Sequence, residues 1–188
     1  MVIFFFVNHI DLYKVIINWG DNVELISFKG EYDIILLVAI VLAMIMMSIV
    51  VSLFNPNAKE EYYSLSRPKF APPAILFKII WLFLYILIAW SLYRIILITN
   101  TGENTVIQLT LFISQLIINY LWSFVFFKFK KRKLALGILI ILILLVIALI
   151  ISLMKLDILS AILLLPYLIW LLFALVLLVY IMKRNKEQ

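Results

Sequence analysis

The chain has 188 residues, of which 67% are hydrophobic and only 14% are charged, and its mean hydropathy is +1.21. A soluble domain of this length cannot bury so much apolar surface, which excludes a soluble enzyme, a nucleic-acid-binding module and a disordered chain as descriptions of the whole. There is no cysteine, and Lys and Arg exceed Asp and Glu by 16 to 10. We therefore expect a polytopic membrane protein without disulfides, without a metal site and without a nucleic-acid partner.

Residues 1–33 form an N-terminal extension that precedes the first long apolar run. Within it, polar side chains recur every three or four residues until a Gly-Asp-Asn sequence at 20–22 interrupts the pattern. One polar stripe on an otherwise apolar segment is typical of a helix that lies in the membrane interface. The extension is therefore predicted to hold an interfacial amphipathic helix on the outer face, where the single histidine, His9, is solvated rather than a ligand.

Five apolar runs follow within residues 34–184, and each is long enough to cross a bilayer, which takes about 20 residues. Their hydrophobicity is continuous rather than alternating, so they predict an all-α bundle of five transmembrane helices and not a β-barrel. Only the second run contains cations, Lys78 and Arg94, and we expect both long side chains to reach the lipid headgroups. The predicted spans are residues 34–54, 74–98, 106–127, 134–154 and 158–182, with a tail at 185–188.

An odd number of spans places the two termini on opposite sides of the membrane. The loops at 55–73 and 128–133 share a side with the C-terminal residues 183–188, and with Lys78 these segments hold 12 of the 16 Lys and Arg. The positive-inside rule predicts that this side is cytoplasmic and that the N-terminus is outside, in a bacterial cytoplasmic membrane. The basic 128–133 loop is then a cytoplasmic turn that obeys this rule, with weak attraction to anionic lipid as a second role.

The 55–73 loop contains Pro68, Pro72 and Pro73 interleaved with aromatic residues. Proline fixes φ and pushes the preceding residue towards an extended conformation, so the loop is predicted to be stiff, with Pro73 in the first turn of the second span. One interpretation is an aromatic belt at the membrane interface. The other is a lid over a cavity that opens on the cytoplasmic side.

The third span carries polar residues at helical spacing, namely Gln108, Gln115 and Asn119, followed by Trp122. These four side chains share one helical face, and amides that face lipid are costly, so this face is predicted to point into the bundle. For Gln108, near the membrane edge, we expect a hydrogen bond between helices. Asn119 is a candidate polar anchor in a mostly apolar small-molecule site.

Three motifs resemble the TspO/MBR family, which comprises the tryptophan-rich sensory proteins and the mitochondrial translocator proteins (peripheral-type benzodiazepine receptors). The resemblance covers about residues 34–184, and Glu61 stands where relatives have the tryptophan of a Trp-Tyr pair. The first motif comprises Tyr62, Leu65, Arg67-Pro68, Phe70, Pro72-Pro73, Trp81 and Leu84-Tyr85. The second comprises Asn119-Tyr120-Leu121-Trp122 and Phe126-Phe127, and the third comprises Pro166-Tyr167-Leu168, Trp170-Leu171 and Phe173-Ala174.

This resemblance implies a membrane receptor or transport protein that binds porphyrins and similar lipophilic molecules, acting as a sensor, carrier or scavenger. Eukaryotic relatives also imply sterol as a ligand, and relatives often form homodimers. The ligand-binding residues expected are Trp81, Tyr85, Asn119, Trp122, Trp170, Phe173 and Ala174. The lid residues expected are Tyr62, Arg67, Pro68, Phe70, Pro72 and Pro73.

A porphyrin is expected here as a ligand rather than a cofactor. Its ring would stack on indoles, and its propionates would reach Arg67, Lys69 or Lys78. Haem iron would find no axial ligand there, because the chain has no cysteine and His9 is predicted on the outer face. Two alternatives stay open. The first is an enzyme that degrades porphyrin, and the spans offer it no nucleophile–base pair. The second is a small transporter.

Overall fold

The computed structural model describes residue 28 and residues 32–185. The predicted interfacial helix of the N-terminal extension, with His9, lies outside these residues, as do residues 186–188. Within the described part, five helices are long and apolar enough to cross a membrane, in agreement with the predicted all-α bundle. Their bounds are α3 (Ile34–Leu53), α5 (Ala74–Asn100), α6 (Val106–Ser123) continued by the π-helical turn η1 (Phe124–Lys128), α7 (Arg132–Met154), and α8 (Ile158–Leu163) followed by α9 (Leu165–Arg184).

Two features of these elements were not predicted. The 55–73 loop contains a short helix, α4 (Ala58–Ser64), whose first turn carries Glu60 and Glu61. The fifth span is divided into α8 and α9 at Leu164, with Pro166 in the first turn of α9. Proline has no backbone N–H and suits the first turn of a helix, which accounts for the new start. Pro73, expected inside the first turn of α5, is instead its N-cap residue.

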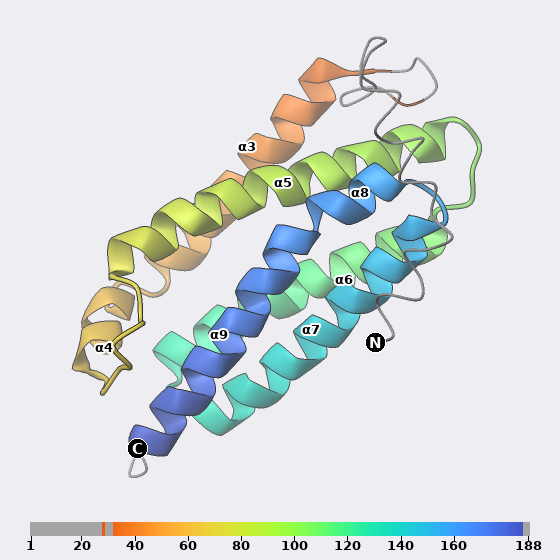
Figure 1. Ribbon diagram of the computed structural model, residues 1–188. Helices are drawn as coiled ribbons and strands as arrows, with labels where there is room; N and C mark the ends of the chain where they lie inside the picture. The colour runs from red at the N-terminus through yellow and green to blue at the C-terminus, as the bar shows by residue number, and fades with distance from the viewer. Residues whose placement is uncertain (1–27, 29–31, 186–188) are drawn as a thin grey trace.

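The helices form an elongated bundle in which α3 packs along α5, and α7 packs along both α6 and α9 (Figure 1). The short helix α8 fills the space between α5 and α7 at the end of the bundle opposite α4. Few backbone positions of α5 approach α6 or α9 closely. Large side chains occupy the space between these three helices, and they form the candidate site below.

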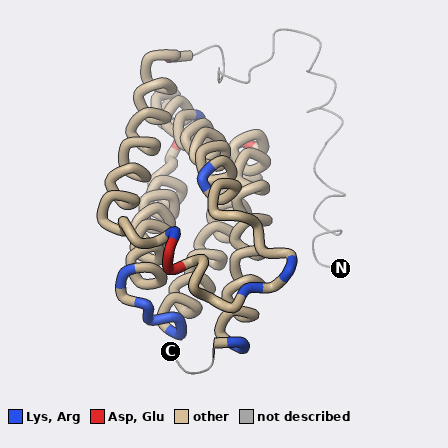
Figure 2. Tube along the Cα trace, turned by 90° about the vertical axis from the view of Figure 1, so that its left-hand side faces the viewer, with Lys and Arg blue, Asp and Glu red and all other residues tan. Residues whose placement is uncertain are grey.

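Cations gather at the end of the bundle that carries α4 and the C-terminal end of α9 (Figure 2). Lys78 is exposed, but the prediction that Arg94 reaches the headgroups is wrong. The side chain of Arg94 is only 4% exposed, and its Nε and Nη2 donate to the two carboxylate oxygens of Asp157 at 2.7 and 3.0 Å. Asp157 is also the N-cap of α8, so one carboxylate secures two helices.

Candidate functional site

Aromatic side chains of α5, α6 and α9 meet in the middle of the bundle. The Trp81 ring lies 5.3 Å from Tyr85 and 6.1 Å from Tyr167, measured between ring centroids, and Tyr85 stacks on Tyr120 at 6.1 Å. The Tyr85 hydroxyl is within hydrogen-bonding reach of the side chains of Asn119 and Tyr120. We call these five residues the inner cluster. It combines flat aromatic surfaces with a few polar groups, as small-molecule sites commonly do.

The polar face of α6 points into the bundle, as predicted. Gln115 is fully buried and Asn119 is 4% exposed. Gln108 Nε2 donates to the carbonyl oxygen of Ser152 on α7 at 3.4 Å, which confirms the expected hydrogen bond between helices. Neither amide atom of Gln115 has a hydrogen-bond partner among the described residues. Two turns apart on α6, Gln108 is therefore bonded to α7 through its Nε2, whereas both amide atoms of Gln115 are without a partner among the described residues.

A second group of rings lies closer to the 55–73 loop, and we call it the lid cluster: Tyr62, Phe70, Phe77, Trp170 and Phe173. Phe77 lies 5.3 Å from Trp170 and 5.1 Å from Tyr62, measured between ring centroids. Trp170 stacks on Phe173 at 5.2 Å, and Phe173 in turn meets the edge of Phe70 at 6.2 Å. The loop therefore contributes two of its aromatic rings to a cluster that α5 and α9 complete. Ala174, the next residue on α9, is half-buried.

Trp122 lies in a different aromatic environment. It stacks on Phe126 at 5.2 Å and meets the edge of Phe127 at 6.3 Å, so its ring partners belong to the π-helical turn η1. Its indole Nε1 is buried without a hydrogen-bond partner in the described residues. Among these residues, its ring contacts do not extend to Trp81 or Trp170, so a cavity shared by all three indoles stays a prediction.

The 55–73 loop is folded back on itself by its own tyrosines. Tyr62 Oη donates to the carbonyl oxygen of Pro72 at 2.6 Å, and the backbone N–H of Ala74 donates to Tyr63 Oη at 3.2 Å. The guanidinium carbon of Arg67 lies 4.6 Å from the ring centroids of both tyrosines. Cation–π contacts of this kind and the fixed φ of proline hold the loop in a compact form. Pro68 is buried, whereas Lys69 and Phe70 are exposed.

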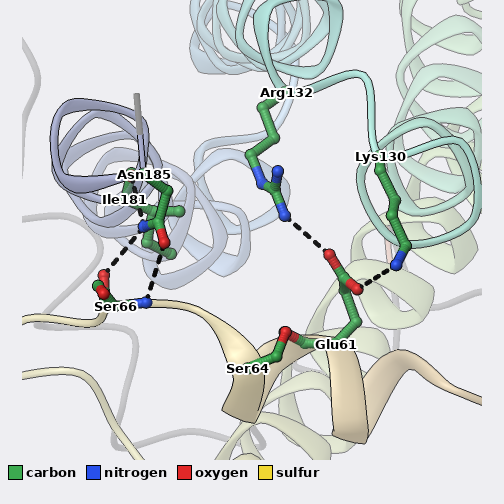
Figure 3. Close-up of polar contacts among 7 residues, drawn as sticks. All are labelled: Glu61, Ser64, Ser66, Lys130, Arg132, Ile181 and Asn185. Carbon is green, nitrogen blue, oxygen red and sulfur yellow. Dashed lines mark hydrogen bonds and ion pairs between the residues drawn. The ribbon is translucent and has the colours of Figure 1, made fainter. Parts of the chain in front are cut away.

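Glu61 has a role that its sequence position did not suggest. Its carboxylate accepts a hydrogen bond from Arg132 Nη2 at 2.7 Å and pairs with Lys130 Nζ at 2.6 Å (Figure 3). The 128–133 loop is therefore more than a turn that obeys the charge rule, because Arg132 is 5% exposed and pairs within the protein. The sequence does contain a signal for this ion pair: an acidic residue in one loop and a basic run in the next loop on the same side of the membrane.

A cavity of about 530 Å³ opens beside this ion pair, between the end of α3, α4 and η1. Its lining includes Asn55, Glu61, Phe127, Lys128 and Lys130. None of the residues predicted to bind a ligand lines this cavity.

The comparisons with known proteins agree with this architecture. The model of the TspO/MBR family matches residues 37–184. The chain is 32% identical to the tryptophan-rich sensory protein of Cereibacter sphaeroides over 63% of this chain and 72% of that protein. It is 31% identical to the protein CrtK of Rhodobacter capsulatus over 63% and 73% of the two chains. It is 35% identical to the tryptophan-rich protein TspO of Archaeoglobus fulgidus over 76% and 92%. This chain therefore belongs to the TspO/MBR family and is an integral membrane protein with several membrane-spanning helices.

Proposed function

We propose that the protein binds a porphyrin or a similar flat, lipophilic molecule between α5, α6 and α9, beneath the 55–73 loop, as a sensor, carrier or scavenger. The observation that carries this proposal is that the inner cluster and the lid cluster occupy successive turns of the same two helices, with Phe77 and Trp81 on α5 and Tyr167 and Trp170 on α9. Aromatic faces stack on a flat macrocycle, and the few polar groups beside them orient it. Membership of a family that includes tryptophan-rich sensory proteins supports the same proposal.

The electrostatics of the loop end suit an anionic lipophile. Lys69 in the loop and Lys78 near the start of α5 are both exposed, and we expect them to meet a carboxylate that projects from the aromatic clusters. Arg67 is held between Tyr62 and Tyr63, so we assign it to the loop rather than to the ligand. We expect the propionates of a porphyrin to pair with the two lysines.

Tryptophan quenching by protoporphyrin tests this proposal in purified protein. We expect saturable quenching in the wild type and at least about fivefold weaker affinity in Trp81→Phe, Trp170→Phe and Asn119→Ala, because each variant removes a stacking surface or a polar anchor worth roughly 1 kcal/mol or more. The matched control is Trp90→Phe, which removes an indole of α5 outside both clusters. Non-saturable quenching, or equal affinities in all five proteins, would eliminate the proposed site.

A further inference from the structure

Among the described residues, polar contacts at Glu61 and at Ser66 fasten the 55–73 loop to α7 and α9 (Figure 3). Glu61 pairs with Arg132 at the start of α7 and with Lys130 just before it. The backbone N–H of Ser66 donates to Asn185 Oδ1 at 3.1 Å, and Asn185 Nδ2 donates to the carbonyl oxygen of Ser66 at 3.2 Å. We call these five residues the clamp. It ties a loop between the first two spans to the ends of the fourth and fifth.

The Arg132 arm of the clamp is stronger than the Lys130 arm. The side chains of Glu61 and Arg132 are 9% and 4% exposed, whereas the side chain of Lys130 is 60% exposed. Solvent and salt screen an exposed ion pair, whereas a buried charge that loses its partner is energetically costly unless water reaches it. The Glu61 contact therefore favours two arrangements, one paired and closed, the other separated and hydrated.

The surroundings of Glu61 allow the second arrangement. The cavity between α4 and η1 is lined by Glu61 and Lys130, so water has room to hydrate both charges without unpacking of the core. At Ser66, the contact is made by a single carboxamide at the end of α9, where Asn185 Nδ2 also donates to the carbonyl oxygen of Ile181 at 2.8 Å. Release at this point breaks two hydrogen bonds and leaves the helix end capped.

The position of the clamp determines the position of the loop's aromatic rings. Tyr62 follows Glu61 directly, and Phe70 lies four residues after Ser66 in a segment stiffened by proline. Both rings belong to the lid cluster, where they contact Phe77 and Phe173. A displacement of α4 at Glu61 therefore moves the rings that cover the lid cluster.

We propose that the clamp positions the lid and thereby sets the rate at which a ligand enters and leaves the site, with Glu61 and Arg132 as its principal positioning residues. The ligand-exchange part of this inference rests on the proposed function. The movement of the loop does not, and it is measured without a ligand.

The distance between spin labels at Lys69→Cys and Ile140→Cys reports the loop position, since both residues are exposed and the chain has no cysteine of its own. We expect one narrow distance distribution in the otherwise wild-type protein. Glu61→Gln and Asn185→Ala are expected to add a second, displaced population, and Arg132→Lys, which keeps the charge, is expected to stay close to wild type. The matched control is Glu60→Gln, the same charge change on the exposed neighbouring residue. Unchanged distributions in both Glu61→Gln and Asn185→Ala would overturn the clamp.

Stopped-flow mixing with protoporphyrin measures the exchange. For Glu61→Gln we expect both the association and dissociation rate constants to rise about tenfold with little change in Kd, since tenfold corresponds to only about 1.4 kcal/mol, less than the loss of one partner of a buried pair costs. Glu60→Gln should change neither rate constant by more than about twofold, as is usual for an exposed charge. Equal rate constants in the two variants contradict the inference. If wild-type protein binds no porphyrin, the proposed function fails, but the distances between the spin labels still test whether the clamp positions the loop.

Discussion

Each end of the bundle contains a buried arginine that is paired with an acidic residue of another element: Arg94 with Asp157, and Arg132 with Glu61. Transfer of both charges out of water costs several kcal/mol per ion, so such a pair is no guarantee of extra stability. Removal of one partner is strongly destabilising, because it leaves the other charge buried and uncompensated. Single substitutions in these pairs should therefore have large effects.

Asp157→Asn is expected to lower the free energy of unfolding by about 3 kcal/mol or more. The variant leaves the Arg94 guanidinium, whose side chain is 4% exposed, without a counter-charge, and it weakens the N-cap of α8. The midpoint of thermal unfolding in detergent, followed by tryptophan fluorescence, measures the loss. The matched control is Lys155→Ala, an exposed charge in the same short connection, which should shift stability by no more than about 0.5 kcal/mol.

The pH dependence of this pair follows from the pKa of Asp157, which lies in the connection between α7 and α8. Burial alone would raise this pKa, but hydrogen bonds and charge from Arg94, together with hydrogen bonds from Ser160, outweigh it and hold the pKa below the ordinary carboxyl value. A depressed pKa means that the contribution of the carboxylate is complete above the ordinary value of about 4 and disappears as the pH falls through the folded-state pKa. The difference in unfolding midpoint between wild type and Asp157→Asn should therefore be constant between about pH 5 and about pH 8 and should shrink only below that range. A difference that shrinks near pH 6 would contradict this assignment.

Substitution of Gln115 is expected to stabilise the protein, in contrast to substitution of Asp157. Neither of its amide atoms has a hydrogen-bond partner among the described residues, although the side chain is fully buried. An unsatisfied buried polar group costs about 1–3 kcal/mol, so Gln115→Leu, of similar size, should raise the thermal midpoint of the ligand-free protein. Asn119→Leu, one turn along the same face, should lower it, because that amide is within hydrogen-bonding reach of Tyr85. A lower midpoint for Gln115→Leu would mean that its amide has a partner in the membrane.

At the scale of elements, the long helices follow from hydrophobic run length alone. Five uninterrupted apolar runs predict five spans, and the helices begin and end within a few residues of the predicted bounds. The short helix α4 was not predicted, since its seven residues include four polar ones and no long apolar run. Tertiary contacts stabilise it instead: Tyr62 packs on Phe77, and Glu61 pairs with Arg132.

Tyr62 connects α4 to the extended part of the loop through its hydroxyl group. Tyr62→Phe removes the partly buried hydrogen bond to the Pro72 carbonyl oxygen and should make the loop easier to open, at a cost of about 1 kcal/mol. Limited trypsin digestion reports this opening at Lys69, because the bond after Arg67 precedes proline and resists trypsin. We expect cleavage about fivefold faster in Tyr62→Phe, and a smaller change in Tyr63→Phe, whose side chain is exposed. Equal cleavage rates in wild type and Tyr62→Phe would show that this bond does not hold the loop.

At the scale of the whole molecule, the sequence predicted which residues lie inside more reliably than which residues touch. The spacing of Gln115 and Asn119 on α6 predicted burial, and both are buried. Whether Trp122 meets Trp81 depends on the rotation of two helices and on the π-helical turn that follows Trp122, and neither is encoded in residue spacing. The Glu61–Arg132 pair joins residues 71 positions apart, so only the packing of the bundle brings it together.

The orientation of the whole bundle is a prediction that the charge distribution makes and labelling can decide. Cations crowd the end of the bundle with α4 and the C-terminal end of α9, and the positive-inside rule places this end in the cytoplasm (Figure 2). Lys131 and Asn104 are exposed in connections at opposite ends of the bundle, and the chain has no cysteine, so single cysteines at these two positions are unambiguous reporters. In intact bacterial cells with a permeabilised outer envelope, a membrane-impermeant maleimide should label Asn104→Cys and should label Lys131→Cys only after the inner membrane is disrupted. The reverse pattern would place α4 and its clamp outside, and any ligand that passes beneath the loop would then exchange with the outer compartment rather than the cytoplasm.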